Sequence, residues 1–555
     1  MTIGRGDRVA GAPWATRSSV WGAHGAAATA HPLATLIGVD VLKAGGSAVD
    51  AAIAANVALG FVEPIACGIG GDAFALLWDP QAGKVVGLNG SGRSPASLTL
   101  ETHRARATDG VIASHGAISV STPGAVDGWW MLHQRYGRLP WARLFEPTIA
   151  LALEGAPVAQ TVAHYLAGSH RGYTSGRLPI EETQNFLAVW APDGRTPAEG
   201  EVFANPALAR TLRLIAEGGR AGFYEGEVAE TVGRYFARIG GWLSAADLAA
   251  HRGEWVEPAS TSYRGVEVWG LPPNGQGLVT LQMLNMLERF DLAGPGLLST
   301  AAVHLAVEAK RLAFEDRARY YADPAFSQVP AEWLVSKEYA AERARLIRPG
   351  RINRDVRPGE APGQGDTTYL CAADASGMMV SLIQSNFQGM GSGLMPDGLG
   401  FMLQNRGRSF SLKDGHPNLY APRKRPFHTI IPGFATKGGE PWLAFGVMGG
   451  NMQPQGQTQI VTDLVDFGLG LQEAGDAPRW LHEGSSEPNG TPARGSGVLA
   501  LESGVPEPTR AGLAALGWEL GDAPGGFGGY QAIERRPGRY QAASEMRKDG
   551  AALAY

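Results

Sequence analysis

The stretch QGDTTYLCAADASGMMVSLIQSN occupies residues 364–386. It predicts two β-strands joined by a tight turn, because aromatic, aliphatic and β-branched residues fill both halves and "DASG" separates them. Thr367 and Thr368 stand at the mouth of this hairpin. The run before them, residues 349–366, holds three Pro and four Gly but no apolar segment, which predicts an exposed linker.

Composition and charge restrict the class of protein. With 44% hydrophobic and 18% charged residues among 555, the chain is typical of an ordinary globular protein. Its net charge is −5 and it has no long basic run, so we expect neither nucleic acid nor a membrane as a partner. The N-terminus lacks an apolar core of signal-peptide length, which predicts a cytoplasmic location. Cys67 and Cys371 form no CxxC pattern, and we expect two buried free thiols.

Hydrophobic periodicity and turn residues predict several further elements. In chain order they are a loose arm over 1–20, two helices over 31–60 with Ser47 capping the second, a strand pair over 73–92, a long amphipathic helix over 303–324 ended by Pro324, a helix over 457–471 and a last strand pair over 530–546. Strands and helices do not alternate in a βαβ rhythm. The sequence therefore favours a layered α+β fold over a doubly wound parallel sheet.

One glycine-rich motif suggests a nucleotide. "GIGGDA" at 68–73 fits the dinucleotide pattern G-x-G-x-x-A, and a nucleotide-dependent oxidoreductase is a hypothesis that rests on it alone. Pro64 interrupts the segment before it, and Arg93 stands about 20 residues on, where the pattern needs an acidic side chain. A glycine-rich turn before a strand is the better interpretation. We find no P-loop, HExxH or G-x-S-x-G motif, and expect neither a metal nor an organic cofactor.

Thr367 suggests a different chemistry. A threonine hydroxyl is a poor nucleophile, but a free α-amine with a pKa near 8 on the same residue can remove its proton. Thr367 would then have to be the first residue of a chain, which requires a cut at Asp366–Thr367. Spacing alone does not decide the matter, because threonine is common where a strand begins.

Residues 367–407, "TTYLCAADASGMMVSLIQSNFQGMGSGLMPDGLGFMLQNRG", resemble the start of the small subunit in the gamma-glutamyltransferase family. These are N-terminal nucleophile (Ntn) hydrolases, which cut themselves before a Thr. The likeness extends over nearly the whole chain and includes "EPIACGIGGDAFAL", "KRPFHTIIPGF" and "VMGGNMQPQG". It implies a four-layer αββα sandwich, an α+β fold in which two antiparallel sheets face each other between helical layers.

The resemblance also implies how the chain is divided. Residues 1–366 would form the large subunit and residues 367–555 the small subunit, with one core shared across the cut rather than two independent domains. The two fragments would stay together as partners. A homo-oligomer is compatible with the sequence, which does not decide the oligomeric state.

The resemblance assigns catalytic roles to a few positions. Thr367 would attack its own preceding carbonyl at Asp366 and later the substrate amide. Ser385 matches a second hydroxyl that hydrogen-bonds the freed Thr. Gly449 and Gly450 match the pair whose backbone N–H groups form the oxyanion hole, and such donors contribute about 3–4 kcal/mol each.

Substrate-binding positions follow from the same resemblance. Arg93 matches an arginine that clamps the substrate carboxylate, which suits a guanidinium fork. Asn405 falls in the substrate-binding loop. Ser409 stands where the family usually has an Asp that holds the glutamyl α-ammonium, and His428–Thr429 replace a Ser–Ser pair that binds the α-carboxylate. His428 is either a substrate ligand or a packed ring.

Further departures bear on the substrate. Phe387 replaces a substrate-binding Asn, Arg406 replaces a Gln, and Tyr369 replaces a His near the cut. The segment 410–426 is shorter than the family's lid loop. Because an unpaired buried ammonium is costly, the missing Asp should weaken gamma-glutamyl binding.

The sequence therefore predicts a self-cleaving amide hydrolase or acyltransferase that forms an acyl-enzyme. Its substrates would be small-molecule amides: gamma-glutamyl amides such as glutathione, or similar amides whose acyl group bears a carboxylate. An alternative is a glutaryl (cephalosporin) acylase or an oxamate-type amidohydrolase without gamma-glutamyl activity. Another alternative is an uncut, inactive binding protein.

Overall fold

The structure is a computed structural model that describes residues 14–354, 356 and 366–555, with only the backbone described for Asp366 and Thr367. Two seven-stranded antiparallel sheets form its centre. The first sheet contains, in spatial order, β1 (Val20–Gly22), β18 (Arg539–Ser544), β17 (Tyr530–Arg536), β13 (Glu440–Val447), β12 (Gly433–Lys437), β9 (Val266–Gly270) and β8 (Ala259–Tyr263). The second contains β19 (Ala551–Ala554), β2 (Ala26–Thr29), β10 (Asp366–Ala373), β11 (Met379–Phe387), β3 (Asp72–Asp79), β4 (Lys84–Gly90) and β7 (Glu254–Val256).

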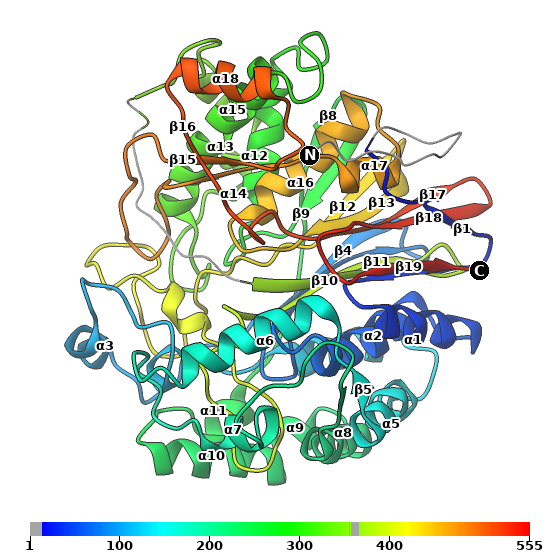
Figure 1. The fold of residues 1–555 in the computed structure, drawn as a ribbon, viewed down its shortest axis with the longest axis vertical. Helices are drawn as coiled ribbons and strands as arrows, with labels where there is room; N and C mark the ends of the chain where they lie inside the picture. The colour runs from blue at the N-terminus through cyan, green and yellow to red at the C-terminus, as the bar shows by residue number, and fades with distance from the viewer. Residues whose placement is uncertain (1–13, 355, 357–365) are drawn as a thin grey trace.

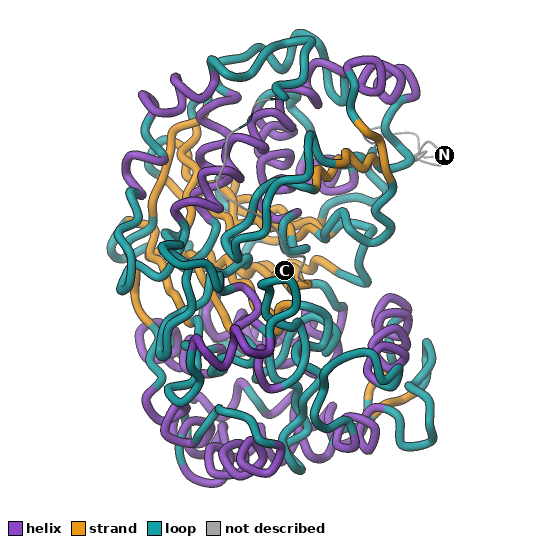
Figure 2. The backbone as a smooth tube through the Cα atoms, turned by 90° about the vertical axis from the view of Figure 1, so that its left-hand side faces the viewer, coloured by secondary structure: helices purple, strands orange, loops and turns teal. Residues whose placement is uncertain are grey.

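The two sheets face each other, and helices cover the outer face of each (Figures 1 and 2). The first sheet carries α12 (Gly277–Leu287) and α16 (Met452–Val465), with α13 (Thr300–Tyr320), α14 (Ala331–Leu334), α15 (Lys337–Ala344), α17 (Leu471–Asp476) and α18 (Glu507–Leu516) around them. The second sheet carries α1 (Pro32–Lys43), α2 (Ala48–Val62) and α4 (Ala125–Tyr136). This is the αββα sandwich that the sequence predicts.

Further helices extend the layer over the second sheet, and two small sheets complete the chain. The helices are α3 (Leu100–Arg106), α5 (Glu146–Glu154), α6 (Gln160–Tyr173), α7 (Gln184–Trp190), α8 (Pro206–Gly218), α9 (Ala221–Tyr224), α10 (Gly226–Ile239) and α11 (Ala245–Ala250), with 3₁₀ turns η1 (Ala117–Ser119), η2 (Trp141–Leu144) and η3 (Arg406–Ser409). The small sheets are β14 (Trp480–Glu483), β15 (Val498–Leu501) and β16 (Glu519–Gly521), and β5 (Ala156–Pro157) with β6 (Val202–Phe203).

The predicted hairpin is confirmed as β10 and β11, which lie in the middle of the second sheet between β2 and β3. Its turn closes with a hydrogen bond from the Asp374 amide to the Met378 carbonyl (3.1 Å), and Gly377 has a φ of +89° that favours glycine. The linker predicted over 349–366 lies mostly outside the described residues.

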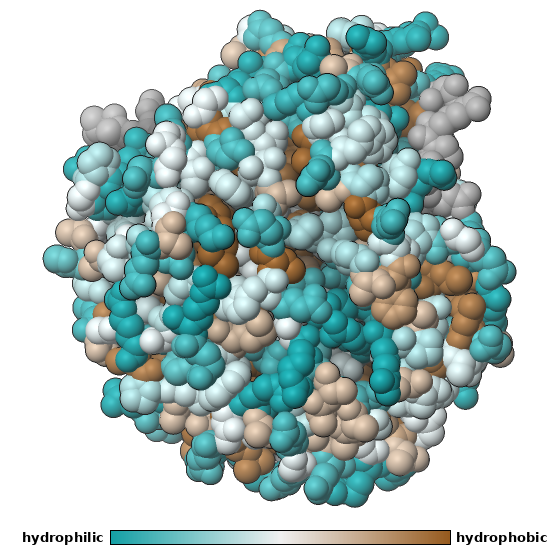
Figure 3. All heavy atoms as spheres, turned by 180° about the vertical axis from the view of Figure 1, so that it is seen from behind, coloured by the Kyte–Doolittle hydropathy of each residue, from teal (hydrophilic) through white to brown (hydrophobic). Residues whose placement is uncertain are grey.

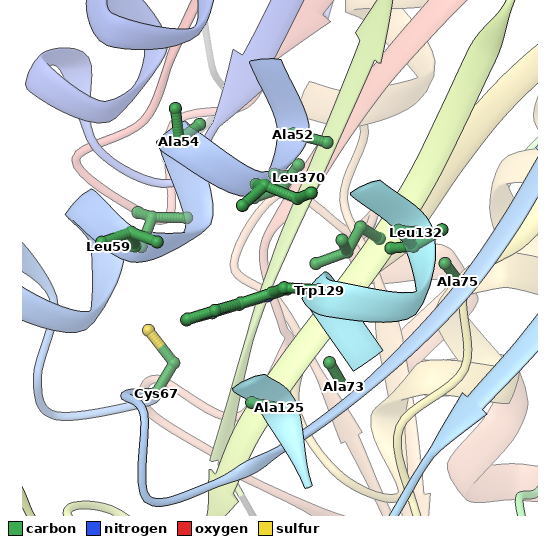
Figure 4. Close-up of a cluster of buried hydrophobic side chains, with 14 of the residues drawn as sticks. Ala52, Ala54, Leu59, Cys67, Ala73, Ala75, Ala125, Trp129, Leu132 and Leu370 are labelled. Carbon is green, nitrogen blue, oxygen red and sulfur yellow. The ribbon is translucent and has the colours of Figure 1, made fainter. Parts of the chain in front are cut away.

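The second sheet is held against α2 by small side chains. Ser47 caps this helix in a capping box with Asp50, as predicted. The Ala side chains of α2 allow the helix to approach the sheet closely, and Trp129 of α4 fills the remaining space (Figure 4). The indole N–H of Trp129 donates to Asn56 Oδ1 (2.8 Å), so its polar atom is satisfied. This core contains residues from both sides of position 366.

Three predictions about elements are wrong. The arm is packed from Trp14 onward: Ala15 is buried, and the Thr16 amide and hydroxyl both donate to Asp476. The helix predicted over 303–324 runs from Thr300 to Tyr320 and is buried on nearly every side rather than amphipathic. The helix predicted over 457–471 is α16, which runs from Met452 to Val465, and its polar first turns are buried.

The nucleotide hypothesis is also wrong. Residues 68–71 form a turn, in which the Gly71 amide donates to the Gly68 carbonyl (2.9 Å), between α2 and β3. A dinucleotide motif follows a strand and opens a helix, and here the order is reversed. Cys67 and Cys371 are buried free thiols, as predicted.

The surface of the molecule is mixed. On the face shown in Figure 3, hydrophilic side chains cover most of the area and hydrophobic ones gather in separate small groups. None of the helices in the described residues is long and apolar enough to cross a membrane.

Candidate active site

The start of β10 faces an irregularity in β11. Asp366 pairs with Phe387 and Thr368 pairs with Gln384, so the backbone of Thr367 lies opposite two residues, Ser385 and Asn386. This is a β-bulge, a feature that changes the direction of side chains and is common next to active sites. The side chains of Asp366 and Thr367 lie outside the described residues.

A cleft of about 510 Å³ begins where β11 ends. Gln388 and Gly389 line it directly after β11, and Gly449 and Asn451 line it after β13. Because Phe387 pairs with Asp366, the cleft lies at the end of the second sheet where β10 begins. The predicted nucleophile and the predicted oxyanion glycines are therefore brought to the same end of the molecule.

Gly449 and Gly450 have the geometry of anion-binding residues. Their φ angles are +113° and +55°, a region that side chains other than glycine rarely adopt. Neither N–H donates to any described residue, and both precede the N-terminus of α16. A helix N-terminus favours negative charge, so this turn can stabilise a developing oxyanion.

Buried polar side chains hold the turn at Gly449–Asn451 in place. Gln276 donates to the carbonyls of Thr429 (2.7 Å) and Gly450 (3.0 Å). Arg317 of α13 donates to Gln276 Oε1 (2.7 Å) and to Asn451 Oδ1 (2.8 Å). The same guanidinium forms an ion pair with Glu487 at 2.6 Å. Together these five contacts hold the Gly449–Asn451 turn in position.

Ser385 lies at the bulge, where the resemblance places a second hydroxyl. It is buried, and its Oγ accepts a hydrogen bond from the Phe387 amide (2.8 Å). Phe387 itself has a φ of +80°, which is strained for a residue with a side chain. Strain of this kind clusters at functional sites, and it turns the Phe387 ring onto Arg406 at 4.0 Å.

Asp72, His428 and Arg406 form a buried charged cluster beside Ser385. Asp72 pairs with Ser385 across β3 and β11, accepts from the amide of Gly92 (2.9 Å) and contacts His428 Nε2 at 2.9 Å. Burial raises the pKa of Asp72 to about 7, opposed by the charge of Arg406. Burial and Arg406 hold the pKa of His428 well below its usual range, so its ring is neutral.

Arg406 is the cation of this cluster. It is fully buried, and burial lowers its pKa to about 9 against the opposing charge of Asp72. Its Nη1 donates to Thr429 Oγ1 (2.8 Å), while Nε and Nη2 have no hydrogen-bond partner among the described residues. A buried guanidinium with two unused donors creates a positive potential at this point.

A small pocket adjoins this cluster. It is lined by Phe387, Arg408, Ser409, Phe427, Thr429, Glu487, Pro488 and Asn489. Phe387 and Gln388 are neighbours in sequence but line the small pocket and the cleft respectively. The two spaces therefore both adjoin the end of β11.

The remaining predicted residues hold the structure rather than line the cleft. Asn405 is buried, donates to the Ser114 carbonyl (2.5 Å) and accepts from the Gln388 amide (3.0 Å). His428 packs on Phe74 with ring centroids 4.8 Å apart, in addition to its bond to Asp72. The packed-ring interpretation of His428 thus agrees with its contacts.

Arg93 also has protein partners. Its Nη2 forms an ion pair with Glu254 at 2.8 Å and its Nη1 donates to the Arg252 carbonyl (3.2 Å). Arg425 contacts the same Glu254 oxygen at 2.6 Å. Arg93 is not one of the described residues that line the cleft or the small pocket.

Several residues of the site could not be found from sequence patterns. Asp72 lies 356 positions from His428, and as the residue after a glycine run it had no signal of its own. Gln276, Arg317 and Glu487 also join distant segments. The one usable signal was the high density of charged residues in the helix around Arg317. If such a helix is buried, its charged side chains must pair with other buried groups. The described residues contain no cluster of His, Cys, Asp or Glu that could hold a metal ion.

Two facing antiparallel sheets between helical layers, with a central hairpin that begins at a cleft, define an Ntn hydrolase. Residues 34–555 match the family described as gamma-glutamyltranspeptidase, and the chain belongs to this family of hydrolases.

The relatives differ in activity. Cephalosporin acylase from Bacillus halodurans has a crystal structure that matches with a TM-score of 0.90, at 41% identity over 99% of both chains. Glutathione hydrolase-like YwrD proenzyme of Bacillus subtilis (strain 168) is 38% identical over 81% of this chain and 83% of that protein. Oxamate amidohydrolase proenzyme of Klebsiella pneumoniae subsp. pneumoniae is 34% identical over 96% of this chain and 98% of that protein.

Proposed function

We propose that the protein is a self-cleaving amide hydrolase in which Thr367, freed by a cut after Asp366, attacks the substrate. The observation that carries this proposal is the turn after β13: Gly449 lines the cleft at the end of β11, Gly450 follows it, and neither amide donates to a described residue. The backbone of β10 begins beside this end of β11. The α-amine of Thr367 would accept the hydroxyl proton. The two glycine amides would bind the oxyanion, and water would release the acyl group.

The acyl group would carry a carboxylate but no ammonium. Ser409 and Thr429 line the small pocket, and Arg406 lies buried directly behind Thr429 and Phe387. Glu487, an acidic residue in the same wall, is already paired with Arg317. A gamma-glutamyl group would therefore place an ammonium where positive potential prevails and where the described residues that line the pocket offer no unpaired carboxylate, which is costly.

The cut is tested by denaturing gel electrophoresis and N-terminal sequencing of the purified protein. Wild type should give two fragments, residues 1–366 and 367–555, with Thr367 as the new first residue. Thr367→Ala should give one full-length band, and Thr367→Ser, which keeps a hydroxyl, should still cut. Thr368→Ser is the matched control, because it keeps the hydroxyl that donates to Glu63. A wild-type protein that is active but remains one chain would overturn the mechanism. One that remains one chain and is inactive would favour an uncut binding protein.

The acyl preference is tested with two anilides that differ only in the α-amine. We expect glutaryl p-nitroanilide to show a kcat/KM at least about tenfold above that of gamma-glutamyl p-nitroanilide, a difference of about 1.4 kcal/mol. Oxamate serves as the short-chain comparison. A higher kcat/KM for the gamma-glutamyl anilide would contradict the role given to Ser409 and would assign a glutathione hydrolase activity instead.

A further inference from the structure

The segment 63–68, which leads from the end of α2 towards β3, contacts the bulged strand β11. The Asn386 amide donates to the Ala66 carbonyl (3.1 Å), and Gln384 Nε2 donates to the Gly68 carbonyl (2.6 Å). Asn386 is one of the two bulge residues, and Gln384 forms the first regular pair beyond them. The segment therefore holds β11 at the place where this strand lies opposite the predicted nucleophile.

The same segment also holds β10, through the carboxylate of Glu63. Thr368 Oγ1 donates to Glu63 Oε2 (2.5 Å), and both residues are buried. Thr368 directly follows Thr367, so it would become the second residue of the small fragment, whereas Glu63 belongs to the large one. This hydrogen bond therefore crosses the predicted cut and fixes the strand one residue from the predicted nucleophile.

The environment of Glu63 is costly for a carboxylate. Glu63 is the C-cap of α2, and a helix C-terminus disfavours negative charge. The residue is also only 3% exposed, and burying a charge is expensive. Burial and the charge of Glu63 together raise the pKa of the nearby Cys67 thiol well above its usual range. A residue that is kept against such costs is typical of a functional site.

Building on the function proposed above, we propose that Glu63 is a positioning residue for Thr367. Acting through the Thr368 hydroxyl, it holds the start of β10 against the bulge, both before the cut and after it. Attack on a carbonyl requires the reacting atoms to be aligned and about 3–3.5 Å apart, and a displacement of about 1 Å can cost a factor of about 100 in rate. Both self-cleavage and turnover of substrate therefore depend on this hydrogen bond.

This tether matters most after the cut. Position 367 then becomes the first residue of a fragment, and the ends of chains are poorly ordered unless they are tied down. The register between β10 and β11 shifts at this position, between the pairs Asp366–Phe387 and Thr368–Gln384. The Thr368 side chain therefore adds a restraint where the pairing of the two backbones is irregular.

The same arrangement accounts for the glycines of the motif at 68–73. A Cβ added to Gly71 would come within 2.4 Å of the Ser385 carbonyl oxygen, and one added to Gly70 within 2.0 Å of the Met402 carbonyl oxygen. Both distances are far inside van der Waals contact. The motif therefore lets the chain after α2 lie directly against β11, a structural role that needs no nucleotide.

Self-cleavage during cell-free synthesis, followed by denaturing gel electrophoresis, tests the role of Glu63. Glu63→Ala and Thr368→Val each remove the hydrogen bond and should slow the appearance of the two fragments by about tenfold or more. Glu63→Gln keeps a weaker, neutral acceptor, so its rate should fall between those of wild type and Glu63→Ala. The double variant should cut no more slowly than the slower single variant, because both changes remove one interaction. Losses that add in the double variant would contradict the pairing.

Thr509→Val is the matched control for Thr368→Val. The Thr509 hydroxyl is also buried and donates to the Leu298 carbonyl (2.6 Å), so it too joins the two predicted fragments, but from α18 in the helical layer of the other sheet. Both variants should lower the melting temperature. Only Thr368→Val should slow self-cleavage and, once cut, lower kcat for glutaryl p-nitroanilide with less than about a twofold change in KM. Wild-type rates in Thr368→Val, or equal losses in both variants, would overturn the inference.

Hydrogen exchange separates this inference from the proposed function. Thr367→Ala provides one intact chain in which the start of β10 can be compared with and without Glu63→Ala. The amides of residues 368–370 should exchange at least about tenfold faster when Glu63→Ala is added, whereas Thr509→Val should leave them unchanged. If wild type is neither cut nor active but this difference is found, the proposed function fails and the anchoring of β10 by Glu63 stands. If Glu63→Ala leaves the exchange unchanged, Glu63 does not fix the strand and the inference fails.

Discussion

Asp72 is a single residue on which several parts of the site depend. It joins β3 to the amide of Gly92, to Gln404 and to the ring of His428, all through one buried carboxylate. Its pKa is raised to about 7, mainly by burial. The folded state therefore binds a proton at this carboxyl more tightly than the unfolded chain does, whose Asp pKa lies near 4.

The ionisation of the Asp72 carboxyl should be visible in the pH dependence of the stability. A raised pKa in the folded state contributes stability at low pH, and that contribution is lost as the pH rises from about 4 to about 7. Asp72→Asn removes the ionisation and should flatten this part of the curve. We expect the melting temperature of wild type to fall relative to that of Asp72→Asn across this range.

The exposed Asp40→Asn serves as the control and should leave the curve unchanged. A difference between wild type and Asp72→Asn that stays constant from pH 4 to pH 7 would mean that this carboxyl does not titrate there.

At the residue scale, the sequence identified positions but not their partners. Phe387, Arg406, Ser409 and His428 could be recognised as departures from a family pattern. Their mutual contacts could not, because Arg406 stacks on Phe387 and His428 contacts Asp72 only after three segments have been brought together. A pattern shows what stands at one place in the chain, whereas a buried cluster is a property of the tertiary fold.

At the scale of elements, α13 is the least predictable helix. Its many charged residues predict an amphipathic helix with an exposed face, yet Glu308, Lys310 and Arg317 are all buried. They are satisfied internally: Glu308 pairs with Arg311 at 2.6 Å, and Lys310 donates to Ser485 (2.8 Å). Charged side chains that periodicity predicts to be exposed are therefore buried, because they pair with groups from distant parts of the chain. The hairpin and the helix capped by Ser47 were predictable because their signals are local.

Gln276, which precedes α12, connects Arg317 of α13 to the Gly449–Gly450 turn, and this connection gives a testable expectation. Gln276→Met removes both amide donors that hold the carbonyls of Thr429 and Gly450. Small displacements of an oxyanion donor are expensive, so kcat should fall by about tenfold or more while KM changes little. Steady-state kinetics on the glutaryl anilide measures the two parameters separately.

Gln282→Met provides the matched control. Gln282 is a buried glutamine of α12, the helix that Gln276 immediately precedes, and it bonds to Asp316 and Tyr321 away from the cleft. Both variants should lose stability, but only Gln276→Met should lose kcat. Equal losses of kcat in the two variants would mean that Gln276 acts through general stability and not through the position of the turn.

At the scale of the whole molecule, the two predicted fragments are interleaved. In the second sheet, β10 and β11 lie between β2 and β3, and in the first sheet β9 pairs with β12. Each sheet therefore contains strands from both sides of position 366. The layered architecture was predictable from the family resemblance, whereas periodicity alone gave only an α+β class.

This interleaving predicts that the cut protein behaves as one body. Cleaved wild type should elute as a single species in size-exclusion chromatography and unfold in one calorimetric transition, because neither fragment can complete a sheet alone. Uncut Thr367→Ala should elute at the same position and also show a single transition. Two separate transitions, or fragments that separate without denaturant, would show that the fragments are independent domains.

The last residue of the chain lies against the first strands. The Tyr555 carbonyl accepts from His24 (2.8 Å), its amide donates to Gly25 (3.1 Å), and β19 pairs with β2. A peptide long enough to run back along β1 could therefore join position 555 to the residues before this strand, and the chain could be reopened between 366 and 367. Such a circular permutant would be synthesised with Thr367 directly after the initiator methionine, whose enzymatic removal would expose the α-amine. Maturation by self-cleavage and turnover of substrate, which the natural order of the chain ties together, would become two separately measurable events.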